Sequence, residues 1–109
     1  MSFFESEVIR AEMAEIQELQ EEVYNKIFSF PQMVTEDKVT HVDKLERLLE
    51  KQRVFYTRLS LSDDPQAKMM KENIAKSARM MGMPENVDMS VVFQNMNSML
   101  KVMREQIDR

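Results

Sequence analysis

VDKLERLLEKQRVFYTRLSLSDD, residues 42–64, carries the longest apolar stripe in the chain. Six side chains in this stretch recur at steps of three and four residues, which places them on one face of a helix. They are Val42, Leu45, Leu49, Gln52, Tyr56 and Leu59. Leu48 and Phe55 lie beside this line and widen it into a face that can pack against a core. We therefore expect a long helix that is held by its apolar face.

A sharp corner is predicted where this helix ends. Pro65 lacks a backbone N–H and disfavours helical geometry at Asp64, yet it fits the first turn of a new helix. The side chain of Asp64 or of Ser62 can accept hydrogen bonds from the free N–H groups of that turn. Arg58 lies one turn before the corner and is able to pair with Asp63 or Asp64.

Local signals divide the chain into four predicted helices. They cover residues 3–30, 35–60, 65–81 and 88–107. The signals are Ser2 and Glu5 at capping-box spacing, Pro31, Thr35 as a cap, Gly82 with Pro84 after it, and Asn86 or Asp88 as a cap. Because the link between the first two helices is short, they should form an antiparallel hairpin. The predicted fold is all-α: one domain over residues 1–109, with a long antiparallel hairpin and two shorter helices in an elongated bundle.

Composition and charge limit the function. The chain has 43% hydrophobic residues, one Gly and no Cys, so disulfides and thiolate metal sites are excluded. No apolar run approaches the roughly 20 residues of a membrane span, and the acidic start is unlike a secretory signal. We therefore expect a cytoplasmic protein without membrane contact. The net charge of −4 disfavours phosphate backbones, so nucleic acid is not an expected partner.

No catalytic, cofactor or metal site is predicted. His41 is the single histidine, and a transition-metal site would need further nitrogen or sulfur ligands. Asp63 and Asp64 could bind a hard cation together with Ser62, but helix capping explains them without a ligand. We therefore predict a protein that is not an enzyme.

Methionine is unusually frequent, with twelve in the chain and nine of them between Met69 and Met103. One interpretation is an adaptable binding face, because thioether side chains repack around varied partners. The other is an ordinary core in which Met replaces Leu, and we favour it because most of these residues fall on inward stripes. Five side chains remain as a candidate interaction surface: Met80, Met81 and Met83 around Gly82, with Phe3 and Phe4 at the start of the chain.

Several short motifs resemble a known family. They are Phe3-Phe4-x-Ser6-Glu7, Leu45-Glu46-x-Leu48-Leu49, Val54-Phe55, Arg58, Leu61-Ser62-x-Asp64, Ala67, Met69, Gly82, Phe93-x-x-Met96 and Met103. With them the chain is similar to a small uncharacterised protein family of cyanobacteria, members of which also occur in cyanophages. The resemblance implies a small helical protein of unknown function in the cytoplasm of a cyanobacterium, or of a host cell infected by a phage.

Together these observations predict a helical protein–protein interaction protein. The first two helices are long for a chain of this size, and a monomer would leave part of their stripes uncovered. We therefore expect a homo-oligomer that associates through the hairpin. There are two alternatives, of which the second would use the same stripes for self-assembly. One is a phage-encoded regulator that binds a host protein through the first helix or the Met80–Met83 corner, and the other is a phage virion or assembly component.

Overall fold

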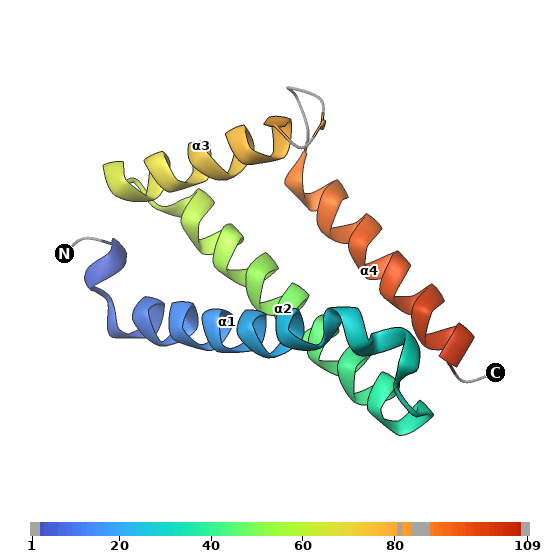
Figure 1. The fold of residues 1–109 in the computed structure, drawn as a ribbon. Helices are drawn as coiled ribbons and strands as arrows, with labels where there is room; N and C mark the ends of the chain where they lie inside the picture. The colour runs from blue at the N-terminus through green and yellow to red at the C-terminus, as the bar shows by residue number, and fades with distance from the viewer. Residues whose placement is uncertain (1–2, 81, 84–87, 108–109) are drawn as a thin grey trace.

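The longest helix, α2 (Thr35–Leu61), runs through the middle of the molecule and contacts the three other α-helices (Figure 1). The computed structural model describes residues 3–80, 82–83 and 88–107. Their arrangement measures 47 × 33 × 19 Å, and its smallest dimension is close to two helix diameters of about 10 Å. The molecule is therefore elongated and flat, with α2 as its spine.

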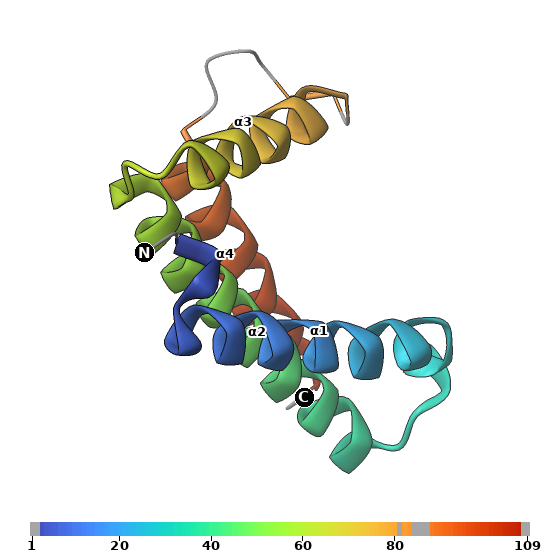
Figure 2. The ribbon, with the colours of Figure 1, turned by 90° about the vertical axis from the view of Figure 1, so that its left-hand side faces the viewer.

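The other elements surround α2 on three sides. They are η1 (Phe3–Glu5), α1 (Glu7–Lys26), η2 (Ile27–Gln32), α3 (Pro65–Met80) and α4 (Met89–Ile107). Helices α1 and α4 lie on different flanks of α2, and α3 lies across its C-terminal end (Figures 1 and 2). The described residues form only helices and their connections, which confirms the predicted all-α, elongated bundle. None of the described helices is long and apolar enough to cross a membrane.

The hairpin of α1 and α2 is antiparallel, as predicted, and ion pairs fix its register. Glu12 contacts Arg58 at 3.3 Å, Glu15 contacts Lys51, and Glu22 contacts Lys44 at 3.3 Å. The residue numbers rise along α1 while they fall along α2, as opposite helix directions require. The predicted pairing of Arg58 with Asp63 or Asp64 is therefore wrong, because α1 supplies a carboxylate to Arg58 instead.

The first predicted helix, residues 3–30, is divided into three pieces. Ser6 has an extended backbone with ψ of 131°, so η1 turns away from the axis of α1. This turn places Phe3 and Phe4 against the buried cluster around Phe55. At the other end the α-helix stops at Lys26, and residues 27–32 continue as a 3₁₀ helix that contains Pro31. Packing of the two half-buried N-terminal rings against the core explains the break at Ser6.

The corner at Asp64 is built as the sequence predicts. Asp64 Oδ1 accepts a hydrogen bond from the Gln66 N–H at 2.9 Å, and Ser62 Oγ accepts one from the Asp64 N–H at 3.1 Å. The other carboxylate oxygen of Asp64 accepts a bond from the Phe3 N–H, 61 residues away. The bonds from the Phe3 and Gln66 N–H groups lower the pKa of Asp64 below its ordinary value, because the charged carboxylate accepts them. Asp64 therefore caps α3 and holds η1 beside it.

The remaining helix ends are partly as predicted. Gly82 has the left-handed φ of 96°, and Asp88 accepts bonds from the Ser90 N–H and hydroxyl at the start of α4. The predicted Thr35 cap is wrong: α2 begins at Thr35 itself, with Val34 as the N-cap and no side-chain hydrogen bond there. The signals at Ser2, Pro84 and Asn86 lie outside the described residues.

The buried core lies mainly where α1, α2 and α3 meet. One cluster joins Ile9, Phe55, Leu59 and Ala67, and a second joins Leu19, Val23 and Leu48. Leu49 is also buried, as the stripe on α2 predicts. Helix α4 has 19 residues and contributes only Leu100 to the buried set among the described residues. Most of the apolar surface of α4 is therefore only partly covered.

Candidate functional site

A long hollow without charge lies over α2, between α1 and α4. It consists of two adjoining cavities of about 690 and 170 Å³. The larger is lined by Met13, Ile16, Gln17, Gln20, Gln52, Phe55, Tyr56, Met70, Ile74, Met89, Val92, Phe93 and Met96. The smaller is lined by Leu45, Leu48, Leu49, Gln52, Met96, Met99, Leu100 and Met103. Because Gln52 and Met96 line both cavities, we treat them as one surface and call it the apolar trough.

The chemistry of the trough differs from that of the rest of the surface. Charged residues make up 31% of the chain, yet none of the described residues that line the trough is Asp, Glu, Lys, Arg or His. Its polar groups are three glutamine amides, from Gln17, Gln20 and Gln52, and the hydroxyl of Tyr56. Such a surface can bind apolar groups and a few neutral hydrogen-bonding groups, but it offers no ionic partner.

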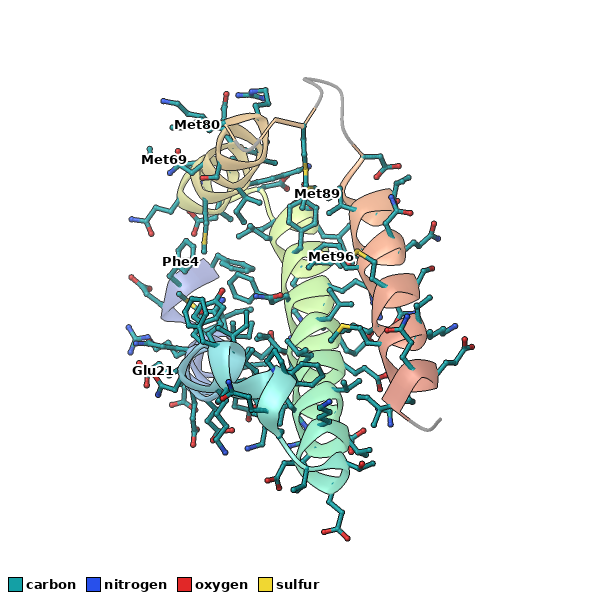
Figure 3. All side chains as sticks on the ribbon, turned by 45° about the vertical axis from the view of Figure 1, so that its right-hand side comes forward. Phe4, Glu21, Met69, Met80, Met89 and Met96 are labelled. Atoms are coloured by element: carbon teal, nitrogen blue, oxygen red, sulfur yellow. The ribbon has the colours of Figure 1, made fainter. Side chains whose placement is uncertain are left out.

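Six of the ten methionines that the structure describes line this trough. None of the ten methionines that the structure describes is buried, so the interpretation of an ordinary methionine core is wrong. Branched and aromatic side chains and two alanines fill the core instead. Met70 packs against it, and the six methionines of the trough lie beside it. In Figure 3 Met89 and Met96 lie on the side of α4 that faces α2, whereas Met69 and Met80 belong to α3 at the end of the molecule.

The helical period explains how α1 forms one wall of the trough. Ile9, Leu19 and Val23 are its buried residues, and they define the side that faces α2. Met13, Gln17 and Gln20 follow at steps of four and three along the neighbouring side, which is the trough wall. In the sequence, Gln20 interrupts an apolar stripe that includes Ile9, Met13, Ile16 and Val23, and this interruption was the signal that could have revealed the wall.

A second, polar cavity of about 450 Å³ lies on the other side of the contact between α2 and α4. Tyr56 and Phe93 line both hollows, and their ring centroids are 6.0 Å apart. This aromatic pair therefore forms part of the partition between the trough and the polar cavity.

The carboxylates in the polar cavity already have partners. Glu50 accepts two hydrogen bonds from the Arg53 guanidinium, at 2.6 and 3.0 Å, and these bonds lower the pKa of Glu50. Asp88 accepts bonds from the hydroxyl and N–H of Ser90, which lower its pKa as well. Both groups are thus held in the ionised form near neutral pH, where they cannot donate a proton as a general acid.

The candidate surface predicted from the sequence is not one patch. Phe3 and Phe4 are half-buried, with ring centroids 5.0 Å apart, and they pack against the core. Met80 is 81% exposed at the end of α3, and Met83 is half-buried. Met81 lies outside the described residues. The sequence therefore pointed to two places, and it missed the trough because the trough is assembled from four helices.

His41 is buried near the start of α2, with its ring centroid 5.2 Å from that of Phe30. Burial and the nearby ammonium groups of Lys26 and Lys44 lower its pKa, since each disfavours the charged imidazolium. His41 is therefore a neutral packing residue of the hairpin, and it does not line the trough.

Comparison with known proteins places the chain in a family. Neither the curated proteins nor the solved structures contain a significant match to this sequence. A family described as a domain of unknown function, DUF1825, matches residues 1–107. The match covers nearly the whole chain, including every helix that forms the trough, and the chain therefore belongs to the DUF1825 family.

Proposed function

We propose that this chain is a non-enzymatic protein–protein interaction protein and that the apolar trough is its binding surface. The observation that carries the proposal is the combination of three properties in one hollow. It is apolar, it is uncharged within a highly charged chain, and its methionines are only partly buried. Contiguous exposed apolar surface of this kind typically marks an interaction site.

The side chains of the trough suit a helical partner. Flexible thioethers adapt to the shape of an apolar stripe, and grooves between helices commonly receive an amphipathic helix. The amides of Gln17, Gln20 and Gln52 can satisfy neutral polar groups beside such a stripe, which would otherwise lose their hydrogen bonds on burial. The trough therefore favours a helix whose binding face carries no charge.

The arrangement of ionisable groups supports a role other than catalysis. The trough supplies no carboxylate or imidazole, and the polar cavity holds its carboxylates in ion pairs or helix caps. Within the described residues no cluster of three His, Asp or Glu side chains could hold a metal ion. A binding function needs none of these groups.

The sequence resemblance supports a setting in a cyanobacterium or a cyanophage. A regulator that binds a host protein and a component of a phage assembly would both use the trough in the same way. We favour self-association over these two roles, because α4 of the chain itself has the neutral character that the trough requires.

The proposal can be tested by photo-crosslinking in cells. A photoreactive amino acid in place of Gln20 reports on the trough. The same group in place of Glu18 reports on the charged side of α1, where Glu18 lines a different hollow together with Leu19 and Lys44. A third variant at Met80 reports on the exposed end of α3. We expect a discrete covalent protein adduct from position 20 and none from positions 18 and 80. An adduct from position 80 alone, or equal labelling at all three positions, would overturn the proposal.

A further inference from the structure

We infer that the apolar trough of one chain receives α4 of a second copy of the same chain, in a two-fold symmetric, antiparallel pair. The inference rests on the proposed function, because it names the occupant of the same surface. In this pair each α4 has two roles: it forms one wall of the trough of its own chain, and it enters the trough of the other chain.

Helix α4 has the surface of a helix with an uncovered side. Met99 is 66% exposed and Val102 is 52% exposed, although both are apolar. From Met89 to Leu100 the helix carries no charged residue on any side, and its polar positions are amides and hydroxyls. A helix surface that faces only water is normally rich in charge, so this neutral run indicates a surface that another protein covers.

Polarity also identifies the occupant. A helix that enters an uncharged trough with a charged face would bury an unpaired charge, which costs far more than the apolar contact contributes. Glutamates run along the outer side of α1, the exposed side of α2 carries Glu50 and Arg53, and α3 carries four cations. Among the described helices of this chain, α4 alone can enter without burying a charge.

Two copies of the chain repel each other overall, since each has a net charge of −4. A contact between two neutral surfaces brings the copies together where no like charges face each other. The side chain of Asn95 and the amides of Gln20 and Gln52 can then form hydrogen bonds at the edge of the contact. The two contact surfaces are therefore both uncharged, whereas a partner with a charged surface would not fit the trough in this way.

The spacing on α4 suits two-fold symmetry. Val92, Met96, Met99 and Met103 follow at steps of four, three and four residues, which is the spacing of a helix–helix seam. When two such helices run antiparallel around a two-fold axis, this side of α4 in one copy contacts the same side of α4 in the other. Val92 then lies opposite Met103 of the second copy, and Met96 lies opposite its Met99. Both troughs are filled at once, so the assembly closes as a dimer.

The first measurement is the solution mass of the full chain over a hundredfold concentration range. We expect a reversible dimer of the 12.9 kDa chain. Met99→Lys should weaken the dimer by about tenfold or more, because it places an unpaired ammonium in the trough of the partner. Met69→Lys is the matched control, since Met69 is also 66% exposed but lies on α3 outside the trough. It should leave the dissociation constant unchanged.

The second measurement tests the direction of the two helices. The chain has no cysteine, so Val92→Cys and Met103→Cys each introduce a unique thiol. A mixture of the two variants should form a disulfide-linked dimer under mild oxidation. Each variant alone should not, because its two thiols would lie about 16 Å apart along the helices in the antiparallel register, at 1.5 Å for each of 11 residues. Disulfide dimers from the single variants would indicate parallel helices and overturn the inference.

The outcomes separate this inference from the proposed function. A constant mass of one chain, or a dimer that Met99→Lys and Met69→Lys affect equally, overturns the second copy as occupant. If the chain is monomeric while Gln20 still gives a covalent adduct with a different protein in cells, the binding function stands and only the inference fails. If neither dimer nor adduct is found, both fail.

Discussion

The two flanks of α2 are packed very differently. On the first, α1 and α3 bury two apolar clusters, and three ion pairs join α1 to α2. On the second, α4 lies along α2 with one buried side chain, and Arg104 anchors its last turn to Asp43 and Glu46. The contrast shows that apolar content does not by itself decide burial, because α4 is the most apolar of the four helices yet buries one side chain, whereas α1 buries three.

The distribution of charge explains the contrast. Helix α1 carries glutamates on both sides of its buried stripe. With this stripe against α2, some glutamates form ion pairs with α2 and the others remain in water. Helix α4 has no comparable charged side along its first three turns. Part of the apolar surface of α4 stays exposed, including Met99 and Val102, and the trough remains open beside it.

The largest expected effect is on the closed flank. Leu59 is 1% exposed between Ile9, Phe55 and Ala67. Leu59→Ala should lower the free energy of unfolding by about 2–5 kcal/mol, through lost burial and the cavity left behind. Chemical denaturation of the purified chain measures this change. A loss below about 0.5 kcal/mol would show that this flank is not the main core.

A matched leucine tests the open flank. Leu100→Ala removes the buried residue of α4, but this site borders a cavity. The expected loss is about 1–2 kcal/mol, because a side chain beside an open hollow has fewer neighbours to lose. Denaturation at low protein concentration, where a dimer is dissociated, gives the intrinsic value. Equal losses for Leu59→Ala and Leu100→Ala would remove the distinction between the flanks.

Acid should lower the stability of the fold through His41 in the hairpin. The lowered pKa of His41 means that the unfolded chain takes up its proton at a higher pH than the folded chain does. The contribution of neutral His41 to the stability of the fold is therefore complete above the ordinary pKa of 6.5, and it is lost as the pH falls below this value. Thermal unfolding should show a lower melting temperature at a pH of about 5.5 than at about 7.5.

His41→Gln is the control for this pH effect, because it removes the titrating group. Its melting temperature should change little over the same pH range. The carboxylates with lowered pKa, such as Glu15, start from an ordinary value of 4.5 and lose their contribution only below it. A pH slope that persists in His41→Gln would contradict the assignment to His41.

The smallest expected effects concern two helix caps. Asp64→Ala removes the cap of α3 and also the tie to the Phe3 N–H, whereas Asp88→Ala removes only the cap of α4. The melting temperature should therefore fall further for Asp64→Ala than for Asp88→Ala. Asp64→Asn should recover part of the loss, because an amide oxygen also accepts cap bonds. A larger fall in melting temperature for Asp88→Ala than for Asp64→Ala would contradict the additional role of Asp64 in holding Phe3.

Part of the trough could be recognised from residue patterns. Gln52 and Tyr56 lie on the predicted α2 stripe, and Gln20 interrupts the α1 stripe, so polar residues within apolar stripes were the available signal. Those patterns do not predict which side of each helix contacts another helix. The 3₁₀ turn that buries Phe3 and Phe4 could not be predicted either, because it depends on Asp64 and Phe55, which are distant in the chain.

Local residue patterns specify the helices other than the first, together with most of their ends. The stop at Asp64–Pro65, the left-handed Gly82 and the cap at Asp88 each depend on groups within a few residues, and local geometry settles them. The packing of the helices settles which methionines are left uncovered and which cation pairs with Glu12, because these contacts join residues tens of positions apart. The trough is the largest of these consequences, since four helices must be placed before it exists.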